Sequence, residues 1–457
     1  MDIKNISDLL RNSIGSSKIK TSEEFLLSYS YDATGIKKNP DIVAFPENES
    51  DISNILKIAS KFKIPVTPRG GGVGYSGGSV PVQGGIVMAF SKMNRILKFD
   101  EKNLLIEAEP GVITGRIIDI CESRGLFYPP DPASLKNSTI GGNVSENAGG
   151  PRCFKYGVTS DYVMAVEGFL MNGEKVKFGS YSIKDVSGYD IKKLIVGSEG
   201  TLIVISKIVL KVIPKPESRI LIRVEFNSLK AGADFIMKII RFNLSPSVLE
   251  FIDKTSLDAV NKYLRTENER DTKSIVILEL DGSSGDVNNK LKSLKRLALE
   301  SGVNDIKIAD NTAEMEELWS IRRNLSPAIS NLKPKKINED IAVPIGKVSD
   351  TIEYISGLAD EYDMCIVMFG HLGDGNIHTN IMIDPADKRE LENSKIILDK
   401  IFKYVVSVKG TISGEHGIGL SKKEYLGYQY SKTEIDIFRK IKSVFDPDNL
   451  LNPGKIF

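Results

Sequence analysis

Residues 68–78 read PRGGGVGYSGG, and this glycine-rich run decides which nucleotide-binding fold the chain can adopt. Gly72–Gly77 matches the GxGxxG pattern, but a dinucleotide-binding loop of that kind opens a helix inside a βαβ unit. Here Pro81 follows, and then the strand-like run GGIVMAF, which begins with Gly84 and Gly85. The nicotinamide-binding Rossmann fold is therefore disfavoured, whereas a loop of backbone N–H groups beside Arg69 can still cradle a pyrophosphate.

A second glycine-rich segment, TIGGNVSENAGGPRCFKYG, occupies residues 139–157. Dense glycine costs folding entropy unless close approach of the backbone to a ligand offsets it, so a merely flexible loop is the weaker interpretation. The two segments together predict one large, phosphate-bearing cofactor that touches both.

The composition excludes several classes of protein. At 457 residues the chain has room for two or three domains, and Lys plus Arg (61) nearly balance Asp plus Glu (60), so we expect no nucleic-acid partner. The three cysteines form no CxxC pair, which argues against a disulfide scaffold, a zinc ribbon and an iron–sulfur cluster. The most apolar window, residues 194–213, contains three charged side chains. No transmembrane segment is predicted, and we expect a soluble, cytoplasmic protein.

Pro214 and Pro216 mark the boundary between two differently patterned halves, because prolines with charged neighbours suit an extended linker. Before them, a helix expected over residues 1–30 is followed by short strands and the two glycine loops. After them, strand-like runs such as RILIRVEF and SIVILELDG alternate with helical patterns, including one over 311–330. The pattern predicts an α+β protein with a separate second domain.

Two of the only three histidines lie in GHLGDGNIHTN, residues 370–380. If Asp374 and Gly375 are the two central residues of a hairpin turn, as this pair favours, His371 faces His378. Directly opposed residues share one face with Cβ atoms roughly 5 Å apart, a spacing at which two imidazoles can bind one metal ion. The sequence therefore predicts a two-histidine site on this hairpin.

Glu415, in SGEHGIG at residues 413–419, is the expected third metal ligand, because the neighbouring glycines let the backbone approach a ligand closely. Two histidines and one carboxylate leave coordination positions open for a substrate, as in catalytic metal sites. His416 would then be available as a base. The alternative is that the two histidines form a cross-strand aromatic pair and Glu415 is a surface acid.

Arg322 falls in the middle of an apolar stripe on the helix predicted over residues 311–330, where Asn311 is the expected N-cap. A buried guanidinium requires an anionic partner. That partner is either a protein carboxylate or a substrate carboxylate held bidentately, and Lys336 could assist in the second case.

These motifs resemble the FAD-linked oxidoreductases of the vanillyl-alcohol oxidase (PCMH-type) superfamily, in the branch with D-lactate dehydrogenase, the glycolate oxidase flavin subunit and D-2-hydroxyglutarate dehydrogenase. The likeness covers nearly the whole chain and rests, in order, on PRGGGVGYSGG, YPPDPAS, TIGGNVSENAGGPRCFKYG, GSEGTL, GHLGDGNIH, SGEHGIG and the terminal NPGK. It implies an α+β fold. A PCMH-type, two-subdomain FAD-binding domain would span 1–215, and a substrate-binding cap with an antiparallel sheet covered by helices would span 216–410. Residues 411–457 would return to the FAD domain.

The resemblance also implies roles for individual residues. The metal ligands would be His371, His378 and Glu415, the base His416, and the groups that bind the substrate carboxylate Arg322 and Lys336. The FAD-binding positions would be Pro68, Arg69, Gly70, Gly71, Gly72, Val73, Gly74, Ser76, Gly77, Pro130, Asp131, Ser138, Thr139, Gly142, Asn143, Asn147, Gly149, Gly150, Tyr156, Glu199, Gly200, Thr201 and Asn452.

The sequence departs from the family pattern at three points, two of which bear on how FAD is bound and on the electron acceptor. Ile203 stands where the pattern usually has glycine, and neither N-terminal glycine loop contains the histidine that some relatives link to flavin, so FAD should be non-covalent. No cysteine-rich segment follows Phe457, so electrons should leave to a separate electron-transfer protein, quinone or cytochrome. The metal is expected to be Zn²⁺, with Mn²⁺ or Fe²⁺ as alternatives. A homodimer and peripheral association with the inner face of the membrane are left open.

The implied activity is oxidation of a D-2-hydroxy acid, such as D-lactate, glycolate or D-2-hydroxyglutarate, to the 2-oxo acid by hydride transfer to flavin N5. One alternative is an FAD-dependent oxidase or transferase of the same superfamily that acts on a different alcohol or an ether-lipid precursor, for which chelators would leave activity unchanged. A second alternative is a non-catalytic flavin-binding assembly subunit, which would not need the metal ligands and the base.

Overall fold

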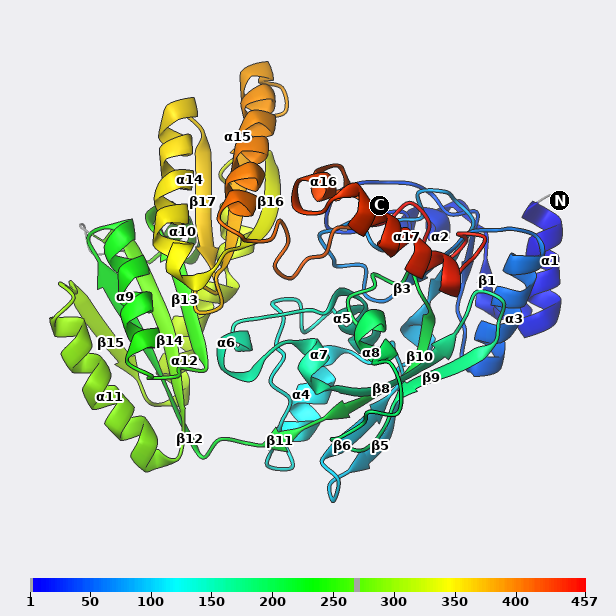
Figure 1. The fold of residues 1–457 in the computed structure, drawn as a ribbon, viewed down its shortest axis with the longest axis horizontal. Helices are drawn as coiled ribbons and strands as arrows, with labels where there is room; N and C mark the ends of the chain where they lie inside the picture. Colours follow the sequence, from blue (N-terminus) through cyan, green and yellow to red (C-terminus); the bar gives the residue numbers. More distant parts are fainter. Residues whose placement is uncertain (1–2, 267–271) are drawn as a thin grey trace. The chain divides into compact units, whose positions relative to one another are not determined.

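The structure of the chain is a computed structural model that describes residues 3–266 and 272–457. It divides into two compact units (Figure 1). The first consists of Met1–Gly149, Val158–Lys215 and Glu415–Phe457, and the second of Gly150–Gly157 and Pro216–Gly414. Its mixed helix and sheet content confirms the predicted α+β class.

The first unit contains a small, mainly parallel sheet of order β1-β2-β4-β3, in which β3 ends in the first glycine loop. Buried side chains of α1 and α3, including Leu10 and Ile55, pack with Ile42 and Ile86 of the strands in one apolar core. These elements are α1 (Ile3–Ile14), β1 (Ile19–Lys20), α2 (Glu23–Ser28), β2 (Ile42–Ala44), α3 (Glu49–Lys61), β3 (Val66–Arg69) and β4 (Ile86–Ala89).

A second, antiparallel sheet of order β5-β6-β10-β8-β9 belongs to the same unit. The second glycine loop begins at α5, which Thr139 caps by accepting a hydrogen bond from the Gly142 N–H (3.3 Å). The elements are β5 (Ile96–Asp100), β6 (Leu105–Ala108), α4 (Thr114–Glu122), β7 (Leu126–Phe127), α5 (Ile140–Glu146), α7 (Thr159–Tyr162), β8 (Val163–Phe169), β9 (Lys175–Gly179), α8 (Ile191–Ile195), β10 (Val204–Lys211) and β11 (Ile213–Pro214).

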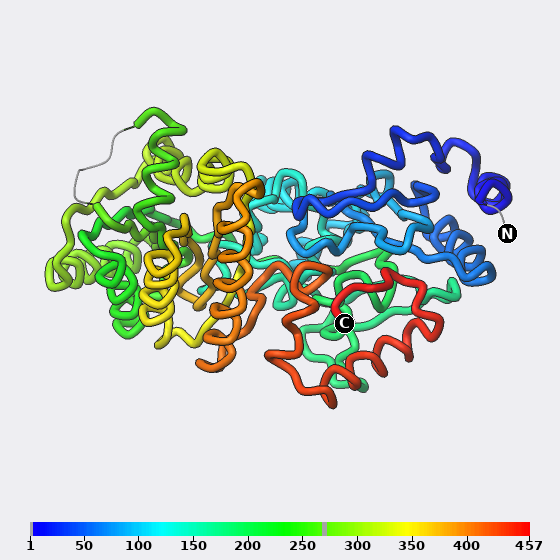
Figure 2. The backbone as a smooth tube through the Cα atoms, turned by 90° about the horizontal axis from the view of Figure 1, so that it is seen from above, coloured from blue at the N-terminus to red at the C-terminus, as the bar shows by residue number. Residues whose placement is uncertain are grey.

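The C-terminal segment of the first unit contains α16 (Leu426–Gln429) and α17 (Lys432–Phe445). Figure 2 traces it in red to the chain end. After α17 the chain joins the small sheet, where Leu451 forms a parallel bridge with Val66 and the Asn452 N–H donates to the Val66 carbonyl (2.7 Å). Backbone hydrogen bonds therefore join Val66 to residues near the C-terminus of the chain.

The second unit is built on a seven-stranded antiparallel sheet of order β15-β12-β14-β13-β17-β18-β16. Its strands are β12 (Ser218–Phe226), β13 (Val248–Asp253), β14 (Ser274–Gly282), β15 (Asp305–Ala309), β16 (Lys335–Ala342), β17 (Cys365–Gly370) and β18 (Asn376–Ile383). Every residue of β18 is buried, which explains why its sequence lacks the alternation of a half-exposed strand.

Helices cover the sheet of the second unit (Figure 1). On one face, residues of α10, α12 and α13 pack against Ile252, Ile275 and Met382. On the other face, Phe235 of α9 packs against Phe226. The helices are α6 (Cys153–Tyr156), α9 (Leu229–Arg241), α10 (Lys254–Leu264), α11 (Ser284–Leu299), α12 (Thr312–Arg323), α13 (Leu325–Ile329), α14 (Val348–Tyr362) and α15 (Lys388–Ser407).

Two of the predicted helices are wrong in detail. Residues 1–30 do not form one helix, because Gly15 takes a φ of +103° and β1 then pairs with β2. The helix predicted over 311–330 begins at its expected cap, where Asn311 Oδ1 accepts from the Glu314 N–H (3.1 Å), but it breaks at Asn324. Pro327 lacks the N–H that a continuous helix would donate to the residue four positions earlier.

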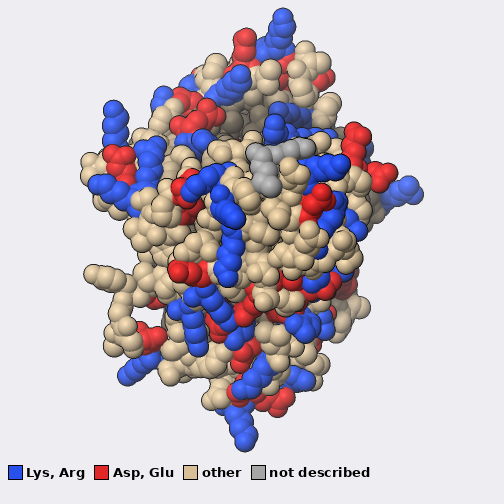
Figure 3. Space-filling view, turned by 90° about the vertical axis from the view of Figure 1, so that its right-hand side faces the viewer, with Lys and Arg blue, Asp and Glu red and all other residues tan. Residues whose placement is uncertain are grey.

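Acidic and basic side chains are interspersed over the face drawn in Figure 3, and neither sign gathers into a large patch. Among the helices of the described residues, none combines the length and apolar character needed to cross a bilayer.

Candidate active site

Both glycine loops line one cavity in the first unit. The predicted FAD-binding residues that line it are Pro68, Arg69, Gly70, Gly71, Gly72, Val73, Gly74, Ser138, Thr139, Gly142, Asn143, Gly149, Glu199 and Gly200. Arg69 is buried, and its Nη1 donates to Ser79 Oγ (3.2 Å). The first glycine loop and Arg69 therefore border the same cavity, as expected of an anion-binding loop.

Close packing explains the glycines of the first loop. A Cβ on Gly70 would lie 2.3 Å from Thr139 Oγ1, and a Cβ on Gly71 would lie 2.3 Å from the carbonyl oxygen of Asn137. A Cβ on Gly74, in contrast, would have no atom within 4 Å. The absence of a side chain at Gly70 and Gly71 therefore allows the loop to pack closely against residues 137–139. Gly74 is not constrained in this way.

We expect Gly71→Ala to lower the midpoint of thermal unfolding of the FAD-free protein, because overpacking against a rigid carbonyl costs about 1–3 kcal/mol. Gly74→Ala is the matched control in the same loop and should leave that midpoint unchanged. If the cofactor approaches the loop as proposed below, Gly74→Ala should weaken FAD binding in a fluorescence titration. Equal midpoints for both variants would contradict this account of the loop.

The other predicted FAD-binding residues do not line this cavity; they are Ser76, Gly77, Pro130, Asp131, Asn147, Gly150, Tyr156, Thr201 and Asn452. Asn452 contacts residues that do line the cavity, because its amide donates hydrogen bonds to the carbonyls of Gly78 and Glu199. Tyr156 lies in the second unit, where its hydroxyl donates to Asp281 Oδ2 (2.7 Å). Sequence reasoning missed other lining residues, notably Asp32, Tyr75, Glu146 and 132–134.

Glu199 fixes the loop that carries His416. The Glu199 carboxylate accepts hydrogen bonds from the N–H groups of Ile418 and Gly419, both at 2.7 Å. Burial raises the pKa of this carboxyl, and the two backbone donors oppose that shift. His416 lies against Tyr75, with ring centroids 5.2 Å apart, and both residues line the cavity. The predicted base is thus held beside the cavity that the glycine loops form.

The histidine hairpin has a different register from the predicted one. Phe369, and not His371, faces His378 across β17 and β18. The turn is longer than two residues, because the Asn376 N–H donates to the His371 carbonyl (3.3 Å). The predicted pairing of the two strands is therefore shifted by two residues. An even shift leaves each side chain on the same face of the sheet. The two histidines therefore still meet.

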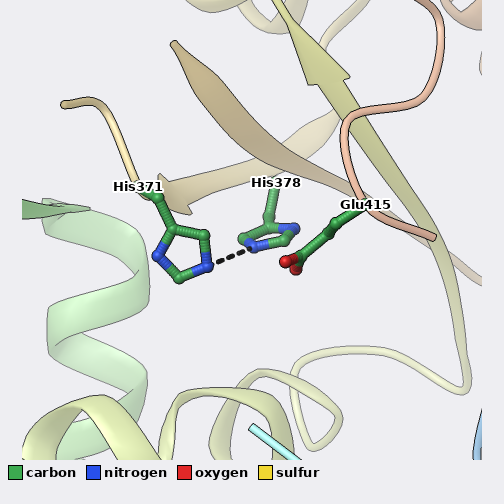
Figure 4. A group of neighbouring side chains, drawn as sticks. All are labelled: His371, His378 and Glu415. Carbon is green, nitrogen blue, oxygen red and sulfur yellow. Dashed lines mark hydrogen bonds between the residues drawn. The ribbon is translucent and has the colours of Figure 1, made fainter. Parts of the chain in front are cut away.

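The imidazoles of His371 and His378 point toward one another (Figure 4). Their Nε2 atoms lie 3.5 Å apart, and both side chains are buried. Two nitrogens bound at about 2.05 Å to a tetrahedral zinc ion are roughly 3.3 Å apart, so the pair fits a metal with little movement. Glu415 follows Gly414, whose N–H donates to Asp340 Oδ2 (2.8 Å). One ligand atom from each of the three residues drawn in Figure 4 lies within 4.8 Å of the others.

Sequence reasoning missed Glu250, the carboxylate that joins two of the predicted site residues. Glu250 is completely buried; His371 Nδ1 hydrogen-bonds its Oε1, and Arg322 Nε donates to its Oε2. Burial alone would raise the pKa of Glu250, but the charge of Arg322 and the hydrogen bonds from His371 and Arg322 lower it to about 2. Arg322 therefore has a protein carboxylate as a partner, and its binding of a substrate carboxylate stays a prediction. The sequence signal was a single acid inside the apolar run SVLEFI.

Other polar side chains share the sheet face of His378. Asn380, two residues further along β18, is 1% exposed, and its amide oxygen and nitrogen have no hydrogen-bond partner among the described residues. Lys336 of β16 lies on the same face, opposite Met382, and donates to Ser326 Oγ (2.9 Å). Burial lowers the pKa of Lys336. A buried amide without partners is costly, so this face has the character of a ligand site.

Sequence comparisons match two family models to this chain. Residues 40–179 match the family model described as "FAD binding domain", and residues 215–456 match "FAD linked oxidases, C-terminal domain". The chain is 39% identical to glycolate oxidase subunit GlcD of Bacillus subtilis, over 100% of this chain and 97% of the relative. It is 33% identical to D-lactate dehydrogenase of Anaerostipes hadrus (97% and 95%) and 31% identical to D-2-hydroxyglutarate dehydrogenase of Stutzerimonas stutzeri (98% and 98%).

Solved structures show the same fold at low sequence identity. p-Cresol methylhydroxylase with bound substrate aligns with a TM-score of 0.83 at 15% identity, over 99% of this chain and 96% of that chain. Alkyldihydroxyacetonephosphate synthase aligns with a TM-score of 0.77 at 16% identity, over 100% and 88%. The chain belongs to the FAD-linked oxidases, in the branch that contains glycolate oxidase subunit GlcD, D-lactate dehydrogenase and D-2-hydroxyglutarate dehydrogenase.

Proposed function

We propose that this protein catalyses the FAD- and metal-dependent oxidation of a D-2-hydroxy acid to the 2-oxo acid. The observation that supports this most directly is the pair of buried Nε2 atoms of His371 and His378, 3.5 Å apart, in a chain of this family. Relatives are named for D-lactate, glycolate and D-2-hydroxyglutarate, all 2-hydroxy acids.

We assign the metal to His371, His378 and Glu415, and non-covalent FAD to the cavity between the two glycine loops. When bound, a divalent ion lowers the pKa of a coordinated hydroxyl, and the flavin accepts a hydride at N5. Zn²⁺ suits two imidazoles and a carboxylate, with Mn²⁺ or Fe²⁺ as alternatives. These three residues would hold the ion and would leave room for a substrate hydroxyl to bind it.

The remaining site residues orient the substrate and move its proton. His416 would take the hydroxyl proton, and its neighbour Tyr75 would limit rotation of the imidazole. Arg322, with help from Lys336, would bind the substrate carboxylate. Asn380 would supply an amide donor or acceptor to an oxygen of the substrate, which would satisfy its buried polar atoms.

Anaerobic mixing with candidate acids tests this proposal. Purified, FAD-loaded protein should lose its flavin absorbance near 450 nm, roughly the band of any oxidised flavin, on addition of one or more of D-lactate, glycolate and D-2-hydroxyglutarate. L-lactate should bleach it far more slowly. Bleaching by none of the acids would reject the 2-hydroxy-acid assignment. Reoxidation of the bleached enzyme by a quinone analogue, a cytochrome or an electron-transfer flavoprotein would then identify the separate acceptor class.

A further inference from the structure

Glu250 lies in the interior of β13, where its neighbours Leu249 and Phe251 are buried apolar residues. A carboxylate in such surroundings persists only when charged partners or strong hydrogen bonds offset the loss of water. Its two oxygens have different partners, since Oε1 is bonded to His371 Nδ1 and Oε2 accepts from Arg322 Nε. All three residues belong to the second unit.

We propose that Glu250 is the positioning residue that orients the metal ligand His371 and the substrate-binding Arg322 together; this rests on the function proposed above. Strand pairing brings the residues together, because Phe251 lies opposite Gly370 and Ile252 opposite Phe369. Continuing that register places Glu250 beside His371. Arg322 reaches the same carboxylate from α12, which covers this face of the sheet.

The bond to His371 selects the tautomer that a metal requires. Because Arg322 Nε donates to the same carboxylate, Glu250 acts as the acceptor toward both partners, and a neutral His371 imidazole would carry its proton on Nδ1. The lone pair of the imidazole then lies on Nε2, the atom that faces Nε2 of His378 at 3.5 Å. Carboxylates that accept from the second nitrogen of a ligating histidine fix its ring in this way.

The bond to Arg322 extends the same control to the substrate. Both bonds end on one carboxylate, so the direction of the guanidinium and the direction of the metal-binding nitrogen cannot vary independently. Glu250 would thus orient the metal ligand and the proposed carboxylate-binding residue without touching the substrate itself.

Glu250→Gln is the first test, because glutamine keeps the shape of the side chain but offers one acceptor and one donor in place of two acceptors. Titration of Zn²⁺ into the metal-stripped, FAD-loaded variant should give an affinity about 10- to 100-fold weaker than for the original protein. Glu279→Gln is the matched control. Glu279 is a buried acid of β14 that pairs with Arg152 and Ser247, and its replacement should leave Zn²⁺ affinity unchanged. Unaltered Zn²⁺ affinity in Glu250→Gln, with only a lower unfolding temperature, would overturn the proposal.

A second measurement needs no substitution at Glu250 and covers the case in which that variant does not fold. Because the chain has only three histidines, ¹⁵N-histidine labelling gives a spectrum that is readily assigned. In the metal-stripped protein, His371 should be the Nδ1–H tautomer, and the Nε2–H tautomer would refute the role of Glu250. Neither readout depends on turnover. A protein that no tested acid reduces would therefore reject the proposed function, while Zn²⁺ affinity and the tautomer would still decide the role of Glu250.

Discussion

Replacement of His416 by alanine is expected to lower the rate of anaerobic flavin reduction roughly 10²- to 10⁴-fold, the usual contribution of a positioned general base. The reason is that the substrate hydroxyl would lose the group that accepts its proton. Stopped-flow absorbance with the best acid of the substrate panel would measure the rate. FAD should stay bound with an oxidised spectrum like that of the original protein, because Glu199 and the glycine loops are intact.

His416→Gln separates proton transfer from packing. Glutamine retains a polar side chain of similar reach beside Tyr75 but cannot accept the proton, so its reduction rate should fall as far as that of the alanine variant. Reduction by either variant at a rate within a few-fold of the original protein would show that His416 is not the base.

Removal of the metal is expected to be nearly as damaging. Dialysis against a strong chelator should lower the reduction rate at least about 100-fold, because the ion contributes several kcal/mol by stabilising the developing alkoxide. One equivalent of Zn²⁺, Mn²⁺ or Fe²⁺ should restore it, and the ion that does so at the lowest concentration identifies the native metal. His378→Ala should match the chelated protein and should not recover when metal is added.

Thr379→Val is the matched control for His378→Ala. Thr379 is the next residue of β18, so its side chain lies on the opposite face of the sheet, and it is also buried. This variant should keep its metal and its reduction rate. Activity that persists in the chelated protein would favour the alternative, an FAD-dependent enzyme of this superfamily that acts on another alcohol or an ether-lipid precursor.

Short motifs in the sequence predicted the fold class, the family and the meeting of the two histidines. The register of the hairpin could not be predicted from its Asp-Gly pair. A Cβ on Gly373 would lie 2.8 Å from the ring of Phe154, and one on Gly375 would lie 2.1 Å from the carbonyl oxygen of Val343. Residues distant in sequence thus determine the shape of this turn, whereas the period of two along each strand preserved the shared face.

Glu250 shows why the rest of the site could not be predicted. The helical stripe on residues 312–329 correctly indicated that Arg322 is buried and requires an anion. The identity of that anion depends on the order of strands in the sheet, which places β13 beside β17 and under α12. A lone glutamate in an apolar strand indicates a buried charge but does not identify its partner.

The boundaries of the two units limit which fragments and which chimaeric proteins can fold. Gly150–Gly157 interrupts the first unit in sequence but clusters with the second, where Arg152 pairs with Glu279 and Tyr156 bonds Asp281. The first unit also needs its last residues, since Leu451 continues the hydrogen bonding of Val66. A fragment cut at Lys215 would therefore lack the segment that hydrogen-bonds to Val66, and its Arg152 and Tyr156 would lose their partners Glu279 and Asp281. An exchange of the whole second unit between relatives would have to transplant 150–157 together with 216–414, as two separate insertions into one host gene.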